Sequence, residues 1–400
     1  MNNTNIKRII KRITAVVFMV IITTVFININ LNLFVDLSKF LNNASFANTY
    51  VKERLSFSRI EKDLLLLFQQ ENLINLHGFM AKKLSMSSLY NNWNIYIAEN
   101  GYIVSAYPHT STDYEFNQII SLKNFLDKRN IKLLYINEPT KYVDDKFISN
   151  SFGVESYIND NADRFLKRIK GAGIATVDLR EELREDGFNV FDLFYRTDHH
   201  WTTRGGLWAT KKIAEGLNKY CDYQINTSMF DESHFSIKKW KKCWLGEQGR
   251  KVGETYVGLD DYEEIKPNFK TDYLFKTSKN LVKGTFNNFV DENVYNTKNS
   301  VYQNKSWHYS YRQIACINNI ITRGKVLVLG DSFEQVVIPF LSLGIHELDC
   351  LIMRDCPNNF NLRKYVVDNK YDTLIIAYTQ HMIGAHDNPK SANYKMFEFK

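Results

Sequence analysis

The chain has 400 residues, of which 44% are apolar and 24% charged, so it can bury a large core and is not a disordered protein. Its net charge of +7 is modest, and Lys7, Arg8, Lys11 and Arg12 supply four of these charges at the N-terminus. The other basic residues are spread along the chain, except at 238–242, where a group of lysines is typical of a solvated face, with polyanion binding as the alternative. We therefore expect no nucleic-acid surface.

The N-terminus has the pattern of a membrane anchor. The basic stretch precedes an uncharged apolar run at 13–27, which can be extended to 34 and then reaches the roughly 20 residues that a spanning helix needs. A small-residue cleavage pattern at 45–47 lies farther from this run than signal peptides usually allow, so we favour an uncleaved anchor at 1–34 over a cleaved signal or a buried core helix. Basic residues before a span stay in the cytoplasm. We expect a single-pass protein of the cell membrane whose folded part is extracytoplasmic.

Residues 35–116 show few turn signals and are interpreted as a stem and an entry to the folded domain at 117–400. In this domain helix and strand patterns alternate, which predicts an α/β fold with a mostly parallel sheet flanked by helices. The predicted helices cover 117–128, 155–170, 204–218 and 334–343, and the predicted strands cover 132–136, 174–179, 325–329, 348–353 and 373–377. The segment 221–311 lacks a sustained period and is interpreted as an irregular insertion of short strands and loops.

A serine follows one of the predicted strands directly. The apolar strand at 325–329 runs into Gly330-Asp331-Ser332, immediately before a predicted helix. A strand-to-helix turn exposes a hydroxyl at the carboxyl edge of the sheet, where the free N–H groups of the helix can bind an oxyanion. Ser332 is therefore a candidate nucleophile, although Asp and Ser in this position also commonly cap a helix.

An acid and a histidine pair stand in the segment 195–201, Tyr-Arg-Thr-Asp-His-His-Trp, at the end of an extended stretch predicted at 189–196 and before a predicted helix. In an extended segment residues two apart face the same way, so Asp198 can bind one nitrogen of His200 while the other nitrogen faces a serine. A serine hydroxyl needs such a base within about 3 Å. Zinc is the alternative for a histidine pair, but neither the other histidines nor the five cysteines show ligand-like spacing, so we expect no metal.

Together these motifs resemble the alginate O-acetyltransferases of the AlgX/AlgJ type, the DHHW family. The residues at 198–201 with the glycine pair at 205–206 look like the Asp-x-His-Trp segment of that family, and 330–332 looks like its nucleophile block, in the same order. The segment 135–142, which contains Pro-Thr-Lys-Tyr after a strand, is similar to a third family segment. The resemblance runs from about 117 to the C-terminus, with the insertion unmatched in detail.

The resemblance implies an SGNH-hydrolase-like catalytic domain, with Ser332 as nucleophile, His200 as general base and later acid, and Asp198 as the residue that orients His200. Independently of it, Arg354 and Tyr378 each follow a predicted strand at the carboxyl edge of the sheet. They are weaker candidates for oxyanion or substrate contacts.

The implied function is extracytoplasmic O-acetyl transfer, through an acyl-serine, to hydroxyls of a cell-surface or secreted polysaccharide, without a cofactor. A membrane-bound O-acyltransferase is the implied partner that provides the acetyl group. No carbohydrate-binding module is expected after the last strand, which is the AlgJ arrangement rather than that of AlgX. A polysaccharide acetylesterase with the same triad and a non-catalytic scaffold of a polysaccharide export complex remain alternatives.

Overall fold

The computed structural model describes residues 70–90, 95–98, 100–141, 145–277, 280–290, 301, 314–384 and 393–400. The predicted anchor at 1–34 and the predicted stem as far as 69 lie outside these ranges. Across the described ranges, no helix is both long enough and apolar enough to cross a membrane. The chain divides into a unit Met1–Ile74 and a compact unit Asn75–Lys400, and the second unit contains all the elements discussed below except the start of helix α4 (Gln70–Lys83).

An eight-stranded sheet forms the centre of this unit, in the order β5-β4-β13-β11-β12-β10-β8-β9. The first five strands of this order run parallel, and the last three add antiparallel pairs. Their bounds are β5 (Ala175–Asp178), β4 (Lys132–Glu138), β13 (Thr373–Thr379), β11 (Lys325–Gly330), β12 (Glu347–Leu351), β10 (Ile314–Asn318), β8 (Tyr273–Lys276) and β9 (Leu281–Gly284). The predicted α/β class with a large central sheet is thus confirmed.

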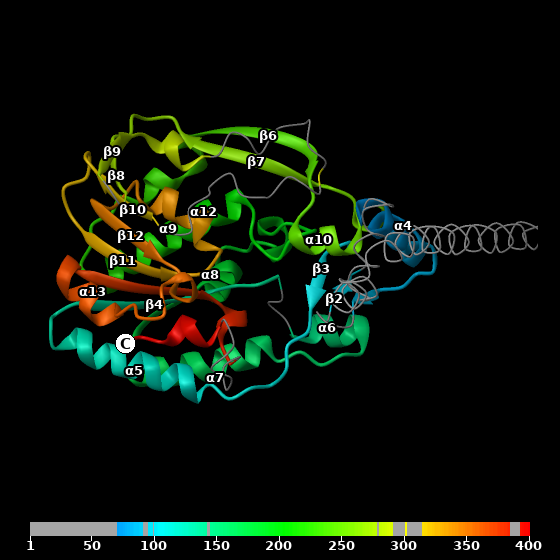
Figure 1. Cartoon of the computed structure of the whole chain (residues 1–400), viewed down its shortest axis with the longest axis horizontal. Helices are drawn as coiled ribbons and strands as arrows, with labels where there is room; N and C mark the ends of the chain where they lie inside the picture. Colours follow the sequence, from blue (N-terminus) through cyan, green and yellow to red (C-terminus); the bar gives the residue numbers. More distant parts are fainter. Residues whose placement is uncertain are drawn as a thin grey trace, which may run out of the picture. The chain divides into compact units, whose positions relative to one another are not determined.

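Helices cover both faces of the sheet (Figure 1). Side chains of α8 (Leu179–Glu185), α9 (Thr203–Tyr220) and α12 (Glu334–Leu341) share one buried core with the sheet. Helices α5 (Asp113–Asp127), α7 (Ile158–Gly171) and α13 (Leu362–Asn369) form the other core. Strand β11 is buried on both sides, since Val328 packs in the first core and Leu327 in the second. This explains why its sequence is a continuous apolar run rather than an alternating one.

The segment 221–311 is more closely integrated than the sequence predicts. Strands β8 and β9 extend the central sheet, while β6 (Phe235–Trp244) and β7 (Asp260–Pro267) form a separate antiparallel pair. Two short helices, α10 (Glu247–Val252) and α11 (Glu254–Val257), connect β6 to β7.

A small sheet precedes the main domain in the chain. It contains β1 (Ser88–Tyr90), β2 (Ile95–Ile97) and β3 (Ile103–Ser105). Buried isoleucines of β2 and β3 pack against Leu245 and Val252 near α10. The short helix α6 (Asp145–Phe152) follows β4, and Ile148 of α6 packs with Val104 of β3.

Candidate active site

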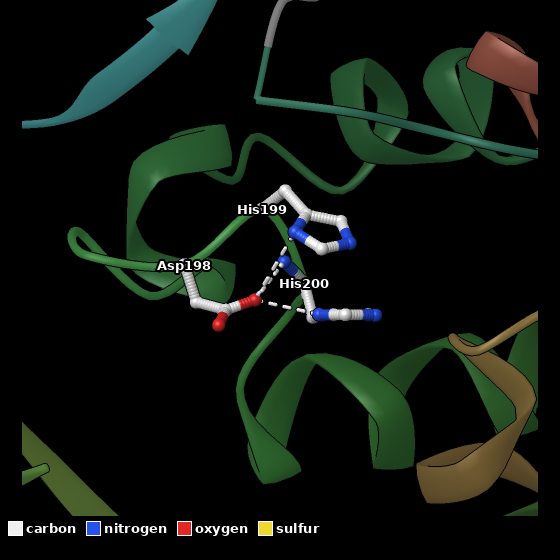
Figure 2. Close-up of side chains that lie close together, drawn as sticks. All are labelled: Asp198, His199 and His200. Atoms are coloured by element: carbon white, nitrogen blue, oxygen red, sulfur yellow. Dashed lines mark hydrogen bonds and ion pairs between the residues drawn. The ribbon is translucent and has the colours of Figure 1, made fainter. Parts of the chain in front are cut away.

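The predicted histidine motif lies in a tight loop between the 3-10 helix Val190–Leu193 and α9. The prediction of an extended segment is wrong here, because the chain reverses direction: Phe194 bridges Trp201 in antiparallel fashion, and the Tyr195 amide donates to the His200 carbonyl at 3.2 Å. Within the loop, Asp198 Oδ1 accepts from the His200 amide at 3.1 Å (Figure 2). This side-chain-to-backbone turn, rather than the period of a strand, brings two residues of this spacing together.

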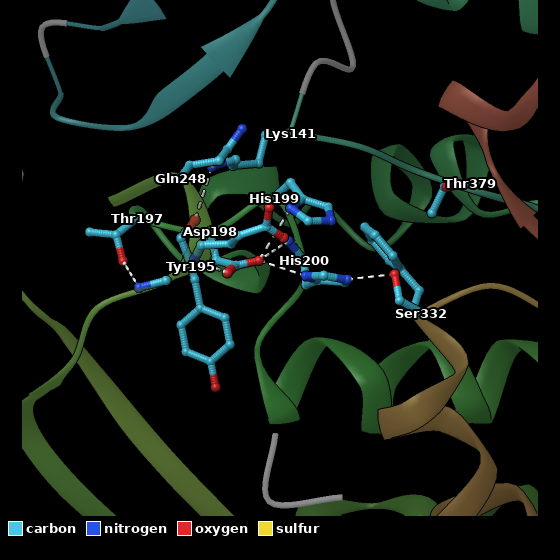
Figure 3. A network of polar contacts seen from close by, with 12 residues as sticks. Lys141, Tyr195, Thr197, Asp198, His199, His200, Gln248, Ser332 and Thr379 are labelled. Carbon is cyan, nitrogen blue, oxygen red and sulfur yellow. Dashed lines mark hydrogen bonds and ion pairs between the residues drawn. The ribbon is translucent and has the colours of Figure 1, made fainter. Parts of the chain in front are cut away.

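In the structure, hydrogen bonds link the side chains of the three predicted triad residues in the order Asp198, His200, Ser332 (Figure 3). His200 Nδ1 lies 2.6 Å from Asp198 Oδ1, and His200 Nε2 lies 2.6 Å from Ser332 Oγ. Asp198 and His200 are buried, and Ser332 is partly exposed. A carboxylate can only accept, so Nδ1 carries the proton of a neutral ring, and Nε2 is then free to accept the serine proton.

The charge of Asp198 is strongly stabilised. Burial raises the pKa of this carboxyl, but His200, His199 and a hydrogen bond from the backbone of Glu247 act in the opposite direction, and the net pKa lies well below its usual value. Asp198 is therefore ionised at neutral pH, as required of a group that orients and stabilises a histidine base.

The turn 330–332, which carries the candidate nucleophile Ser332 (the nucleophile turn), is held in place by the carboxylate of Asp331. Asp331 is fully buried, and its carboxylate accepts from the Phe333 amide at 2.9 Å and from the Thr379 amide and hydroxyl at 2.9 and 2.7 Å. A side chain at Gly330 would place its Cβ 2.2 Å from Glu334 Cγ, so the end of β11 can approach α12 this closely only at a glycine. Ser332 is thereby fixed between β11 and the start of α12.

Direct contacts join the histidine loop to the nucleophile turn. The buried indole of Trp201 donates to the Phe333 carbonyl at 3.1 Å, and the two rings pack edge to face. A Cβ at Gly206 would lie 2.3 Å from Val336 Cγ1, so this glycine allows α9 to pack closely on α12. The Trp and the Gly-Gly pair of the motif thus set the distance between His200 and Ser332.

Residues of the insertion support the same loop, and no sequence signal points to them. Asp260 of β7 accepts from the Arg196 amide at 3.2 Å and from the Thr197 amide and hydroxyl at 2.8 and 2.6 Å. The Gly246 amide donates to the Thr197 hydroxyl at 2.8 Å, and the Glu247 amide at the start of α10 donates to Asp198 Oδ2 at 2.6 Å. These donors and acceptors are separated from the loop by 49 to 64 residues in an aperiodic segment, so no local pattern could reveal them.

His199 lies beside the triad and raises the question of a metal. Asp198, His199 and His200 each offer a ligand atom, and these atoms lie within 4.8 Å of one another. His199 Nδ1 is 3.5 Å from Asp198 Oδ1. Burial, together with the neighbouring charge of His200, lowers the pKa of His199 well below its usual value. Because His200 uses one nitrogen for Asp198 and the other for Ser332, this geometry fits a triad better than a metal centre.

Two carboxyl groups are buried close to the nucleophile turn. Glu138 ends β4 and Glu334 begins α12, and each is at most 1% exposed. Burial, with the charge of Glu334 next, raises the pKa of Glu138 well above its usual value. Burial also raises the pKa of Glu334 to about 7. The pair therefore retains a proton under conditions where isolated carboxyls would lose theirs.

The weaker candidates have different surroundings. Arg354 lies in a 3-10 turn (Met353–Asp355) after β12 and is partly exposed. Tyr378 is fully buried in β13, and its hydroxyl donates to the Met396 carbonyl at 2.7 Å, so it already serves the core. His381, which the sequence did not single out, follows β13, and its ring centre lies 6.3 Å from that of His199. Burial lowers the pKa of His381 to about 4, so this ring is neutral at pH 7.

Residues 102–236 match the sequence model of the SGNH hydrolase-like domain, acetyltransferase AlgX. Over these residues the chain is similar to the AlgX-type acetyltransferases. The predicted resemblance and the predicted enzyme class, an O-acetyltransferase, are confirmed. The AlgX-type match contains Asp198 and His200 but ends before Ser332, so the place of the nucleophile rests on the geometry described above.

Solved structures share the fold of this chain. PatB1 of Bacillus cereus aligns with a TM-score of 0.61 at 17% identity, over 76% of this chain and 99% of that one. The same protein with a sulfonyl adduct gives a TM-score of 0.57 at 17% identity, over 76% and 97% of the chains. A DHHW family protein from Eubacterium siraeum gives 0.50 at 14% identity, over 72% and 89%. No protein of curated function matches the chain in sequence.

Proposed function

We propose that the chain transfers acetyl groups, through an acyl-serine intermediate, to hydroxyls of a cell-surface or secreted polysaccharide. The observation that carries this proposal is the line of two 2.6 Å contacts from Asp198 through His200 to Ser332, in a chain whose residues 102–236 match the AlgX acetyltransferase domain. In the first half-reaction, His200 Nε2 takes the proton of Ser332 Oγ while Oγ attacks the acetyl carbonyl carbon. The bond from that carbon to the donor oxygen breaks, and the donor leaves with the proton from His200.

The second half-reaction reverses these roles. A sugar hydroxyl gives its proton to His200 Nε2, and its oxygen attacks the acyl carbon. The bond to Ser332 Oγ then breaks, and Oγ takes the proton back from His200. Asp198 stays ionised throughout and stabilises the imidazolium that forms in each half. Its low pKa supports this role.

The cellular setting is part of the same proposal. The basic-then-apolar pattern at 1–34 supports a single membrane anchor with the catalytic domain outside the cytoplasm. Acetyl-CoA is not available there, so a membrane-bound O-acyltransferase is proposed as the partner that passes the acetyl group across.

Turnover of an activated acetyl ester by the full chain tests the nucleophile. We expect Ser332→Ala and His200→Ala each to lower the rate of acetyl release by at least about 10³-fold without loss of fold. Ser236→Ala, which removes an exposed hydroxyl on β6, is the matched control and should retain full activity. Activity that persists in Ser332→Ala would contradict the proposed mechanism.

The acceptor requires a separate assay. With an acetyl ester and an oligosaccharide, a transferase forms acetylated sugar, whereas an esterase releases only acetate. Full restoration of polymer acetylation in cells by the Ser332→Ala variant would instead identify a scaffold that does not use the triad.

A further inference from the structure

Lys141 is a buried cation close to the triad. It follows β4 in the Pro-Thr-Lys-Tyr segment and is 2% exposed. Its Nζ lies 3.2 Å from the Tyr195 carbonyl, 3.3 Å from the Arg196 carbonyl and 3.4 Å from Gln248 Oε1. An ammonium group has three N–H donors, and these are three acceptors. The buried charge therefore has a complete set of partners.

These partners stand on the two segments that hold Asp198. Tyr195 and Arg196 lead directly into the histidine loop, and the loop acid follows two residues later. Gln248 belongs to α10, whose first amide, that of Glu247, donates to Asp198 Oδ2. Figure 3 shows Lys141 reaching Gln248 on the side of the loop opposite to Ser332. One ammonium group thus fastens the loop to the helix that binds its carboxylate.

We propose that Lys141 is a positioning residue for the acetyl-transfer reaction: its ammonium holds the segment 195–196 and α10 together, so that Asp198 stays aimed at His200. This inference rests on the proposed function, because it assigns a role in the same triad. Lys141 contacts none of the three triad side chains in the hydrogen bonds described, so it acts through the backbone and Gln248.

The protonation state of Lys141 gives this role a measurable signature. Burial lowers the pKa of Lys141 to about 7, and the carboxylates of Asp198 in the loop and Asp260 on β7 oppose that shift. The positive charge of Lys141 in turn contributes to the low pKa of His199, and the ring of Tyr102 lies 5.7 Å from Nζ. A neutral amine has two donors and a lone pair, so it leaves one of the three acceptors unsatisfied. Acetyl transfer should therefore decline as the pH rises through the pKa of Lys141.

Two variants of the full chain test the proposal through the pH profile of kcat between pH 5.5 and about 9.5. Lys141→Met keeps the length of the side chain and removes all three donors. It should lower kcat at neutral pH by at least about tenfold and abolish this alkaline decline. Gln248→Glu places a carboxylate where the amide oxygen accepts from Lys141, which should move the alkaline decline upward by about one pH unit or more. Gln224→Glu makes the same charge change at an exposed site and should leave the profile unchanged.

Thermal melts separate positioning from unfolding. The pKa of Lys141 is lower in the folded chain than its ordinary value of 10.5, so above pH 7 the unfolded chain binds this proton more tightly. The stability of the wild type relative to Lys141→Met should therefore increase with pH while wild-type activity falls. An alkaline decline that is unmoved in Gln248→Glu, or that persists in Lys141→Met, would overturn the proposal. If Lys141→Met does not fold, the pH profile of Gln248→Glu still tests the proposal. A wild type no more active than Ser332→Ala would overturn the proposed function instead.

Discussion

Replacing Asp260 tests whether the insertion holds the triad loop. Asp260 accepts hydrogen bonds from the amides of Arg196 and Thr197 and from the Thr197 hydroxyl. A hydrogen bond to a charged group contributes about 1.5–3 kcal/mol, and a buried donor without a partner costs a similar amount. Burial raises the pKa of Asp260, so the cost of burying the charge offsets part of this gain. We therefore expect Asp260→Ala to lower the free energy of unfolding by about 3–5 kcal/mol.

Activity should fall in the same variant for a geometric reason. Without Asp260, Thr197 loses two of its bonds, and the loop can shift Asp198 away from His200 Nδ1. A displacement on the order of 1 Å in a catalytic group commonly costs about 10²-fold in rate. Asp260→Asn keeps one oxygen for Thr197 and loses the contact with the Arg196 amide, so it should cost only about 1–2 kcal/mol and less than about tenfold in rate.

Urea unfolding and acetyl-ester turnover measure the two effects. Asp261→Ala is the matched control, since Asp261 is the next residue of β7 and its side chain is exposed. Asp260→Ala with an unfolding free energy within about 1 kcal/mol of the wild type and an unchanged rate would refute the reasoning. The loop would then be held by its own internal turn alone.

Three further substitutions probe other parts of the site. Gly246→Ala would place a Cβ 2.4 Å from Asp198 Cβ, and should destabilise the chain by about 1–3 kcal/mol in urea unfolding and reduce ester turnover at least about tenfold. The folded-state pKa of Glu334, about 7 against an ordinary 4.5, means that its stabilising contribution is full below pH 4.5 and is lost as the pH rises through 7. Glu334→Gln should remove a pH-dependent difference on the order of 3 kcal/mol between unfolding free energies at pH 5 and pH 8. Trp201→Phe removes the donor to the Phe333 carbonyl and should cost about 1–3 kcal/mol in thermal or urea unfolding.

Controls and contrary results differ among these variants. Gly171→Ala meets no atom within 4 Å at the end of α7, so it should be nearly neutral where Gly246→Ala is not. A wild type and a Glu334→Gln variant with parallel pH profiles of stability would show that Glu334 is not the titrating carboxyl. A Trp201→Phe variant as stable as the wild type would mean that the Phe333 carbonyl finds another donor.

The sequence was sufficient to predict that Asp198, His200 and Ser332 lie together, because the signals for these residues are local. Asp198 and His200 are two residues apart, and Ser332 follows an apolar strand directly, so short-range turn chemistry and strand burial were enough to select them. The extended conformation predicted for the histidine segment was wrong, because the side chain of Asp198 bonds the His200 amide and bends the chain instead. A spacing of two residues between Asp198 and His200 is compatible both with an extended segment and with this turn, so the sequence alone did not distinguish them.

The supporting residues could not be predicted in this way. Asp260, Gly246 and Gln248 stand in a segment without sustained periodicity. Asp260 and Gly246 contact Thr197, and Gln248 contacts Lys141, only through tertiary structure. Similarly, β8 is too short to show a period of its own, and it becomes part of the central sheet by pairing with β10. Local propensity and hydrophobic pattern do not predict such strand pairings, because the pairings depend on which strand edges remain unpaired once the parallel strands have formed.

The site therefore has two separable supports. Trp201 and Gly206 fix the distance from His200 to Ser332 through contacts with the turn and with α12, whereas Asp260 and Lys141 fix the orientation of Asp198. His200 acts as base in both half-reactions, so loosening Asp198 should slow acylation and deacylation together. A change in the His200–Ser332 distance should also slow both half-reactions, because His200 takes the proton of Ser332 Oγ in acylation and returns it in deacylation. In pre-steady-state measurements with an activated ester, Trp201→Phe and Asp260→Asn should therefore each slow acylation and deacylation together, and a variant that slows one step alone would contradict this mechanism.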